Sequence, residues 1–275
     1  MIIVMDDELL LAIHRAWGSI RKHGKHPPYF PGAQPVSLEK RHIPILHNRH
    51  YFISNKLDGI RMGFICSNDK VFFINRKMDI FPVDFRVERE FFKGTMLDGE
   101  MMSDGTYIVY DAVMICGHVI RNYNMIKRLT FIYKYVKKLP FKIKKFYLFH
   151  NHKYFLENIY THDADGIIFT PIDEAYKHST NDKLFKWKPV KNITVDYAVK
   201  NGNTYIQDRN NLVFVDSHEW CNDYDDGSII ECEYINNVWT PVKIRSDKDY
   251  PNSVITYNKI MLNIRENIKI SDIIG

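Results

Sequence analysis

Hydrophobic and polar residues change their spacing twice along this chain of 275 residues. Between residues 51 and 110, short β-branched or aromatic runs are broken by Asn, Asp and Gly, a pattern typical of strands and turns. Residues 125–136 then carry apolar side chains at helical spacing. Past Pro189, about five short strands separated by turns follow closely, which predicts a small barrel or sandwich.

The predicted elements are short and of both kinds. Strands are expected at residues 51–53, 60–65, 71–74, 107–110, 146–149, 166–170, 195–199, 204–206, 213–215, 228–234 and 239–244. Helices are expected near the N-terminus, where Asp6 or Asp7 is the cap and Leu9, Leu10, Ile13 and Trp17 share one face, and at 125–136, 153–160 and 259–267. At about 150 residues per domain, the length suits two α+β domains with a boundary near 189–193.

Composition excludes several classes of protein. The chain is 45% hydrophobic and 26% charged, which is ordinary for a folded protein and excludes a largely disordered one. No apolar run approaches the roughly 20 residues needed to span a bilayer, and no secretory signal is visible. The four cysteines form no CxxC pair, so reduced thiols in an intracellular compartment are expected.

The formal net charge is +5, and its positive part is concentrated in residues 127–145. That segment holds eight basic residues and no acidic one, so it is able to attract a polyanion such as RNA. A solvated helix face is the favoured alternative, since the apolar residues of the same segment recur at helical spacing. These are Met125, Ile126, Leu129, Ile132, Tyr133 and Val136.

The hexapeptide Lys56-Leu57-Asp58-Gly59-Ile60-Arg61 is the sharpest local motif. It lies between two predicted strands, so its lysine is held by rigid elements, and the Asp-Gly turn brings Arg61 back toward the same pocket. A lysine amine acts as a nucleophile when burial and neighbouring charge favour its neutral form. An ordinary hairpin turn explains the hexapeptide equally well.

Other short motifs add acids and cations at strand edges. Leu97-Asp98-Gly99-Glu100 and Ala164-Asp165-Gly166-Ile167 each carry a carboxylate beside a glycine, and two such carboxylates are able to hold a divalent metal. Residues 184–189 alternate basic and apolar side chains, which in a strand brings Lys186 and Lys188 to one face. Arg245-Ser246-Asp247-Lys248 is a further basic cluster with an acid. Each motif alone has an ordinary structural explanation.

Taken together, their order and spacing resemble the six motifs of covalent lysine nucleotidyltransferases, the superfamily of mRNA capping guanylyltransferases and ATP-dependent DNA and RNA ligases. The matching segments are 56–61, 98–100, 107–113, 165–168, 186–189 and 244–248. The capping branch is more similar. Residues 30–38 resemble its proline-rich segment, Thr194-Val195-Asp196-Tyr197 its fifth motif, and residues 227–232, 239 and 262–268 the C-terminal part of a viral capping enzyme. Leu57 stands where capping enzymes usually carry Thr. Because ligases vary at this position, a ligase remains an alternative.

The resemblance implies a fold and a set of roles. It implies a nucleotidyltransferase domain over 1–190, with antiparallel sheets and flanking helices, and an OB-fold domain over 191–275 whose C-terminal helix packs back on the first. Lys56 would attack the α-phosphate of GTP and pass GMP to the 5′-diphosphate end of RNA, with Mg²⁺ or Mn²⁺ held by Glu100 and Asp165. The implied GTP-binding residues are Arg61, Arg76, Glu100, Tyr110, Lys144, Asp165, Lys186, Lys188, Arg245, Asp247 and Lys248. Of these, the last three would act on the β- and γ-phosphates as the second domain closes.

The resemblance also bears on partners. A separate RNA triphosphatase and cap methyltransferase are expected on other chains, since this length leaves no room for them. The protein is expected to be a monomer that binds no membrane, of viral origin, in a host nucleus or a cytoplasmic virus factory. Two alternatives stay open: an ATP-dependent polynucleotide ligase that uses the same lysine, and a non-catalytic nucleic-acid-binding protein with a basic helix and an OB-like barrel.

Overall fold

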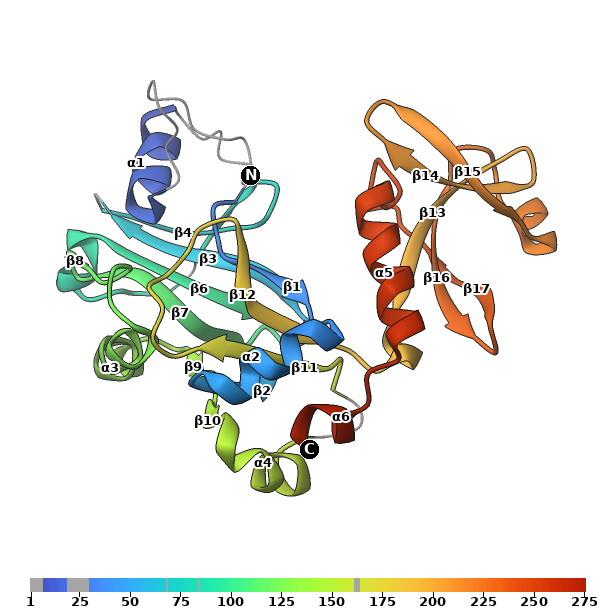
Figure 1. Cartoon of the computed structure of the whole chain (residues 1–275). Coiled ribbons are helices and arrows are strands. Elements are labelled where there is room, and N and C mark those ends of the chain that lie inside the picture. The colour runs from blue at the N-terminus through green and yellow to red at the C-terminus, as the bar shows by residue number, and fades with distance from the viewer. Residues whose placement is uncertain (1–6, 19–29, 68, 84, 161–163) are drawn as a thin grey trace. The chain divides into compact units, whose positions relative to one another are not determined.

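The structure is a computed structural model that describes residues 7–18, 30–67, 69–83, 85–160 and 164–275. The chain divides into two compact units (Figure 1). The first comprises Met1–Val36 and Leu46–Lys186, and the second comprises Ser37–Ile45 and Trp187–Gly275. Among the described residues, no helix has the length and apolar character needed to cross a membrane.

The elements up to the end of the first unit are mostly short strands, with a few short helices among them. They are α1 (Asp7–Trp17), β1 (Gln34–Ser37), α2 (Ile43–Asn48), β2 (Tyr51–Asn55), β3 (Ile60–Ser67), β4 (Lys70–Ile74), β5 (Ile80–Pro82), β6 (Thr95–Met101), β7 (Tyr107–Ile115), β8 (His118–Val119), α3 (Met125–Tyr135), β9 (Lys142–Ile143), β10 (Tyr147–Leu148), α4 (His152–Asn158), β11 (Ile167–Pro171) and β12 (Thr180–Trp187).

These strands form two sheets. The larger has the order β5-β4-β3-β6-β7-β8, and β9 joins it by pairing in parallel with β7. Both faces of this sheet are covered by other elements. Neighbouring residues of a strand point to opposite faces, so they pack in different cores. On β3, Phe64 packs in the core that includes Leu129 and Ile132 of α3, whereas the next residue, Ile65, packs in a second core with Trp17 of α1. This explains the continuous apolar run of β3.

The second sheet of this unit has the order β1-β12-β11-β2-β10. β2 and β11 are antiparallel, with Asn55 opposite Ile167 and Tyr51 opposite Pro171. The end of β2 therefore meets the beginning of β11, and the residue after Asn55 lies beside the two residues before Ile167. This register brings the Lys56 motif and the Asp165 motif together (Figure 1).

Helix α3 tests the interpretation of the basic segment. Asn124 caps it, since its side-chain oxygen accepts a hydrogen bond from the Lys127 N–H at 3.0 Å. Ile126 and Tyr133, which were expected on the apolar face, are instead 51% and 52% exposed. The buried face follows Met125, Leu129, Ile132 and Val136, and Ile126 and Tyr133 lie one residue, about 100°, around the helix from it. Lys127, Lys134 and Lys137 are exposed, as a solvated helix face requires.

The second unit contains one five-stranded sheet, the α-helices α5 (Val254–Glu266) and α6 (Ile270–Ile274), and short 3₁₀ helices. Its strands are β13 (Thr194–Lys200), β14 (Asn203–Asp208), β15 (Asn211–Ser217), β16 (Ile229–Ile235) and β17 (Val238–Ile244). The antiparallel order is β15-β14-β13-β16-β17, and Tyr197, Ile230 and Trp239 pack with Tyr257 and Met261 of α5. β15 and β17 are edges, so the described strands form an open, OB-like sheet. The strand spacing predicted a small barrel or sandwich, and no closed barrel is found among these strands.

The structure differs from the sequence analysis in one domain boundary and in one helix that was not predicted. The first domain was expected to cover residues 1–190, yet the second unit contains Ser37–Ile45 and begins again at Trp187. Ser37–Ile45 joins it through local bonding: the Lys40 N–H donates to Glu266 Oε2 at 2.9 Å, and Asn263 Nδ2 donates to the Leu38 carbonyl at 2.9 Å. The short helix α6 was not expected at all. Asp6, and the side chains of Leu9 and Leu10, lie outside what the structure describes.

A buried ion pair joins α3 to the larger sheet. Arg128 donates from Nε and Nη2 to the Asp111 carboxylate at 2.8 and 2.9 Å, and its side chain is 4% exposed. Nη1 also donates to the carbonyls of Tyr123 and Glu174. Removing the guanidinium leaves a buried carboxylate and two carbonyls without these donors.

Arg128→Met is therefore expected to lower the free energy of unfolding by about 3–5 kcal/mol, measured by urea denaturation. Lys138→Met is the matched control, because Lys138 makes its ion pairs to Glu88 and Glu90 at the surface. Its effect should be much smaller. Equal losses in the two variants would contradict the structural role of the Arg128–Asp111 pair.

Candidate active site

A pocket in the first unit lies between its two sheets and takes side chains from both. It is lined by Ala33, Pro35, Lys56, Leu57, Arg61, Arg76, Asp98, Glu100, Tyr110, Asp111, Met125, Lys144, Phe146, Ile168, Thr170, Tyr176 and Leu184. Six residues predicted from the sequence to bind GTP or to react with it are in this set: Lys56, Arg61, Arg76, Glu100, Tyr110 and Lys144.

Lys56 directly follows β2, and its position is fixed through the backbone. Its N–H donates to the Gly166 carbonyl at 2.8 Å. Its Nζ donates to Asp165 Oδ2, and the two side chains are 23% and 14% exposed. The amine is thus half-buried, oriented by a carboxylate, and at the wall of the pocket. Asp165 itself is not among the lining residues, but it joins the site through this contact.

The segment between Lys56 and β3 packs tightly against β6. A Cβ at Gly59 would lie 2.5 Å from the Met101 carbonyl oxygen, so any larger residue would push β3 away from β6. The Gly59 N–H also donates to Glu100 Oε1 at 3.2 Å. Burial raises the pKa of Glu100, while this hydrogen bond and the cations of the pocket act in the opposite direction. The glycine therefore links the segment after Lys56 to the Glu100 carboxylate.

Arg61 faces a carboxylate that the sequence analysis did not assign to the site. Its Nε and Nη2 donate to Asp98 at 2.9 and 2.5 Å, and Asp98 is fully buried. The Tyr176 hydroxyl also donates to Asp98 at 2.5 Å and accepts from Trp17 Nε1 at 3.2 Å. Asp98 stands two residues before Glu100 in the same motif, which was the available signal; Tyr176 lies in no motif.

Tyr110 and Lys144 line another part of the pocket. The Lys144 Nζ lies 5.6 Å from the Tyr110 ring centroid, and the Arg61 guanidinium carbon lies 5.8 Å from it. Burial lowers the pKa of Lys144 to about 8, the nearby Glu100 acts against this, and Lys56 adds to it. An aromatic ring flanked by two cations is suited to a planar, electron-rich base.

The two predicted phosphate lysines do not share one strand. Lys186 lies on β12, two residues beyond the pocket residue Leu184, and so on the same side of the strand. β12 ends at Trp187, so Lys188 lies beyond it in the second unit. The expectation that both lysines lie on one strand face is wrong, because Pro189 has no N–H to continue pairing and a 3₁₀ helix begins at Val190.

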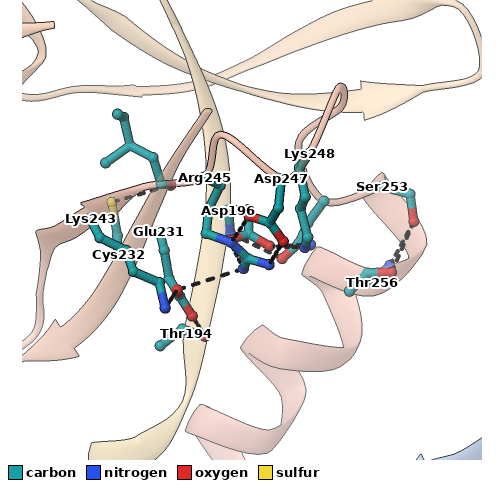
Figure 2. Close-up of polar contacts among 12 residues, drawn as sticks. Thr194, Asp196, Glu231, Cys232, Lys243, Arg245, Asp247, Lys248, Ser253 and Thr256 are labelled. Atoms are coloured by element: carbon teal, nitrogen blue, oxygen red, sulfur yellow. Dashed lines mark hydrogen bonds and ion pairs between the residues drawn. The ribbon is translucent and has the colours of Figure 1, made fainter. Parts of the chain in front are cut away.

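The three predicted phosphate residues of the second unit form one cluster just after β17 (Figure 2). Arg245 donates from Nε and Nη2 to both oxygens of Asp247 at 2.8 Å each. The hydrogen bond to Asp247 raises the pKa of Arg245, and the same bond lowers that of Asp247. Lys248 follows in the same turn, where its N–H donates to the Arg245 carbonyl at 3.0 Å.

The pocket has carboxylates but not a complete cage for a metal. Among the described residues, no three His, Cys, Asp or Glu side chains are grouped as metal ligands. Glu100 and Asp165 both contact residues 56–59: Glu100 accepts from the Gly59 N–H, and Asp165 accepts from Lys56 Nζ. Two hard oxygen donors suit a Mg²⁺-type ion that completes its shell with water and substrate phosphates.

The architecture defines the class of protein, an α+β nucleotidyltransferase fold. Residues 8–190 match the family model of the mRNA capping enzyme catalytic domain, and residues 165–274 match that of the C-terminal domain. The chain therefore belongs to the mRNA capping enzyme family.

Individual relatives agree with this assignment. The chain is 30% identical over 288 residues to the mRNA-capping enzyme of Danio rerio, covering 87% of this chain and 48% of that protein. It is 27% identical over 324 residues to the mRNA-capping enzyme subunit alpha of Schizosaccharomyces pombe, covering 91% and 80%. The chain thus spans about half the length of the first relative. Among solved structures, mycobacterial DNA ligase D complexed with ATP and MES matches 79% of this chain and 95% of that one, at 12% identity and a TM-score of 0.49.

Proposed function

We propose that this protein is an mRNA guanylyltransferase that transfers GMP from GTP to the 5′-diphosphate end of RNA through a lysyl-GMP intermediate. The observation that carries the proposal is the half-buried Lys56 amine at the pocket wall, in contact with Asp165. Arg61, Glu100, Tyr110 and Lys144 line the same pocket, and membership of the capping enzyme family supports GTP as the nucleotide.

In the first half-reaction, Lys56 Nζ attacks the α-phosphorus of GTP. The bond from that phosphorus to the bridging oxygen of pyrophosphate breaks as the nitrogen–phosphorus bond forms, and pyrophosphate leaves. Nζ gives up a proton, and the Asp165 oxygen in contact with it is near enough to accept it. Because little covalent chemistry is required of the protein, positioning and charge neutralisation supply the catalysis.

Other side chains are given roles as well, following the family resemblance. Tyr110 stacks on the base with Lys144 beside it, Arg61 and Glu100 hold the ribose, and Arg76 contacts the ribose or a phosphate. All five residues line the pocket. Lys186 and Lys188 bind the α-phosphate. Arg245, Asp247 and Lys248 act on the β- and γ-phosphates, which are present only in the first half-reaction.

In the second half-reaction, a terminal phosphate oxygen of diphosphate-ended RNA attacks the same phosphorus. The bond between phosphorus and the lysine nitrogen breaks, and the amine regains its proton. The product is a 5′–5′ triphosphate bridge from guanosine to RNA. The fission yeast relative is named a subunit, which supports the expectation that other capping activities reside on separate chains.

A ligase is the competing function, and nucleotide choice separates the two. The protein is incubated with α-labelled GTP or ATP and a divalent cation, denatured, and examined for protein-bound label. Label from GTP and none from ATP is the expected result. Label from ATP alone would replace the guanylyltransferase by a ligase, and label from neither would exclude both as well as the Lys56 intermediate.

Removal of divalent cations is expected to abolish adduct formation, because the phosphates of GTP need their charge neutralised beside Glu100 and Asp165. When bound, such an ion stabilises negative charge on the phosphoryl oxygens. Labelling should return on addition of Mg²⁺ or Mn²⁺, and Glu100→Gln should raise the Mg²⁺ concentration needed for half-maximal labelling. Full labelling of chelator-treated protein would contradict the metal requirement.

A further inference from the structure

Asp196 is a buried carboxylate to which the mechanism above gives no role. It lies on β13, and its side chain is 7% exposed. We propose that Asp196 is the positioning residue that holds Arg245 and Lys248 in place to receive the pyrophosphate part of GTP. The inference rests on the proposed function.

Both cations converge on this one carboxylate (Figure 2). Arg245 Nη1 donates to Asp196 Oδ1 at 3.0 Å, and Lys248 Nζ donates to Asp196 Oδ2. The other side of the guanidinium is occupied by Asp247. A cation on a long, flexible stem is thereby fixed at each oxygen of a single carboxylate, so the distance between the two cations is set by Asp196.

Asp196 is itself held by Asn252 through three hydrogen bonds, two to its backbone and one to its carboxylate. The Asn252 side-chain oxygen accepts from the Asp196 N–H at 3.1 Å, and the Asn252 N–H donates to the Asp196 carbonyl at 2.8 Å. Asn252 Nδ2 also donates to Oδ2 at 3.3 Å. Asp196 therefore cannot shift without breaking contacts of both its backbone and its side chain, which makes it a rigid support.

The strands beside β13 explain why Asp196 needs a cation. Glu231 of β16 lies directly opposite it, and like charges in that arrangement repel. Arg245 Nη1 is 3.6 Å from Glu231 Oε2 as well as 3.0 Å from Asp196, so it bridges the two acids. Lys243 of β17, opposite Glu231 in turn, pairs with Glu231 at 3.2 Å. Asp196, Glu231 and Lys243 therefore form one row of charged residues across β13, β16 and β17. Lys243 contacts Glu231 in this row and makes no ion pair with Asp196 within the described part of the chain.

Loss of the Asp196 charge should free Lys248, and it should leave Arg245 held by Asp247 but no longer tied to Lys248 through a shared anion. Their ordering relative to each other would then have to accompany pyrophosphate binding, at a cost of roughly 10- to 100-fold in affinity. Only steps that involve pyrophosphate should be affected. A general loss of folding would slow every step equally.

The test uses Asp196→Asn in the full chain and runs the first half-reaction backwards. Adduct is formed by long incubation with labelled GTP, purified, and treated with inorganic pyrophosphate, which should regenerate GTP. The half-saturating pyrophosphate concentration should rise roughly 10- to 100-fold over the unaltered protein. Transfer of GMP from the same adduct to diphosphate-ended RNA should stay within about twofold, since that step uses no pyrophosphate. Because both rates are counted per adduct, unfolded molecules do not contribute.

Two further variants keep the result interpretable. Lys243→Met removes a cation of the same row that does not touch Asp196, and it should leave both steps near those of the unaltered protein. Asp196→Glu keeps the charge but moves it by one methylene, so its half-saturating pyrophosphate concentration should also rise. An unchanged pyrophosphate dependence in Asp196→Asn, or equal slowing of pyrophosphate and RNA steps, would overturn the positioning role. Absence of any adduct in the unaltered protein would instead overturn the proposed function.

Discussion

Replacement of Lys56 by Ala is expected to abolish the covalent GMP adduct. The substitution removes the Nζ that Asp165 orients, while the hydrogen bond from the backbone N–H of residue 56 to the Gly166 carbonyl can remain. Lys56→Arg should fail as well, because a guanidinium stays protonated and is no nucleophile. Each variant is incubated with α-labelled GTP and then denatured, and the protein-bound label is measured. The melting temperature of each variant should remain close to that of the unaltered protein.

The pocket provides a stringent comparison for this prediction, since it holds a second lysine. Burial lowers the pKa of Lys144 to about 8, so part of its population is a neutral amine near pH 8. Lys144→Met should retain an adduct, formed more slowly, whereas Lys145→Ala, at an exposed neighbour, should behave as the unaltered protein. An adduct that survives Lys56→Ala and disappears on Lys144→Met would assign the nucleophile to Lys144.

Arg245→Ala is expected to separate the two half-reactions. Loss of a charged contact to phosphate costs about 2–4 kcal/mol of transition-state stabilisation, or roughly 30- to 1000-fold in the rate of adduct formation. Transfer of GMP from preformed adduct to RNA should suffer much less, because pyrophosphate has left by then. Arg245→Lys should recover only part of the rate, since an ammonium cannot reproduce the two bonds to Asp247.

Single-turnover measurements of both steps decide this prediction. Lys186→Ala is the matched comparison, because a contact to the α-phosphate is used in both half-reactions and its loss should slow both. If Arg245→Ala slows the RNA step as severely as adduct formation, the assignment of Arg245 to pyrophosphate is wrong.

The sequence indicated most of the local structure around Lys56 because strands and turns there have strong signals. The strands predicted on either side of Lys56 exist as β2 and β3, and so do all the predicted strands of the second unit. β2 and β3 belong to different sheets, however, so Asp58-Gly59 links two sheets and does not form a hairpin. The spacing could not show that β15 and β17 remain apart, since pairing between strands distant in sequence depends on the tertiary fold.

The residues that support the site were harder to find. Tyr176 and Asp98 meet only because β3, β6 and the segment after β11 are brought together, and nothing in the sequence near Tyr176 indicates this. Asp196 lay within a recognised motif, but its link to Arg245 and Lys248 spans 49 and 52 residues and follows from the sheet register. Motifs identify reacting groups well, whereas the buried partners that hold them become visible only in the fold.

The most direct test of the central claim is a chase of purified labelled adduct with RNA that ends in a 5′-diphosphate. The unaltered protein, freed of GTP, is mixed with the RNA and divalent cation in a single turnover, and the product is digested with nucleases. The account predicts that label leaves Lys56 and is recovered as guanosine joined 5′–5′ through a triphosphate to the first nucleotide. Label that stays on the protein with diphosphate-ended RNA, but moves to a 5′-monophosphate end, would contradict it.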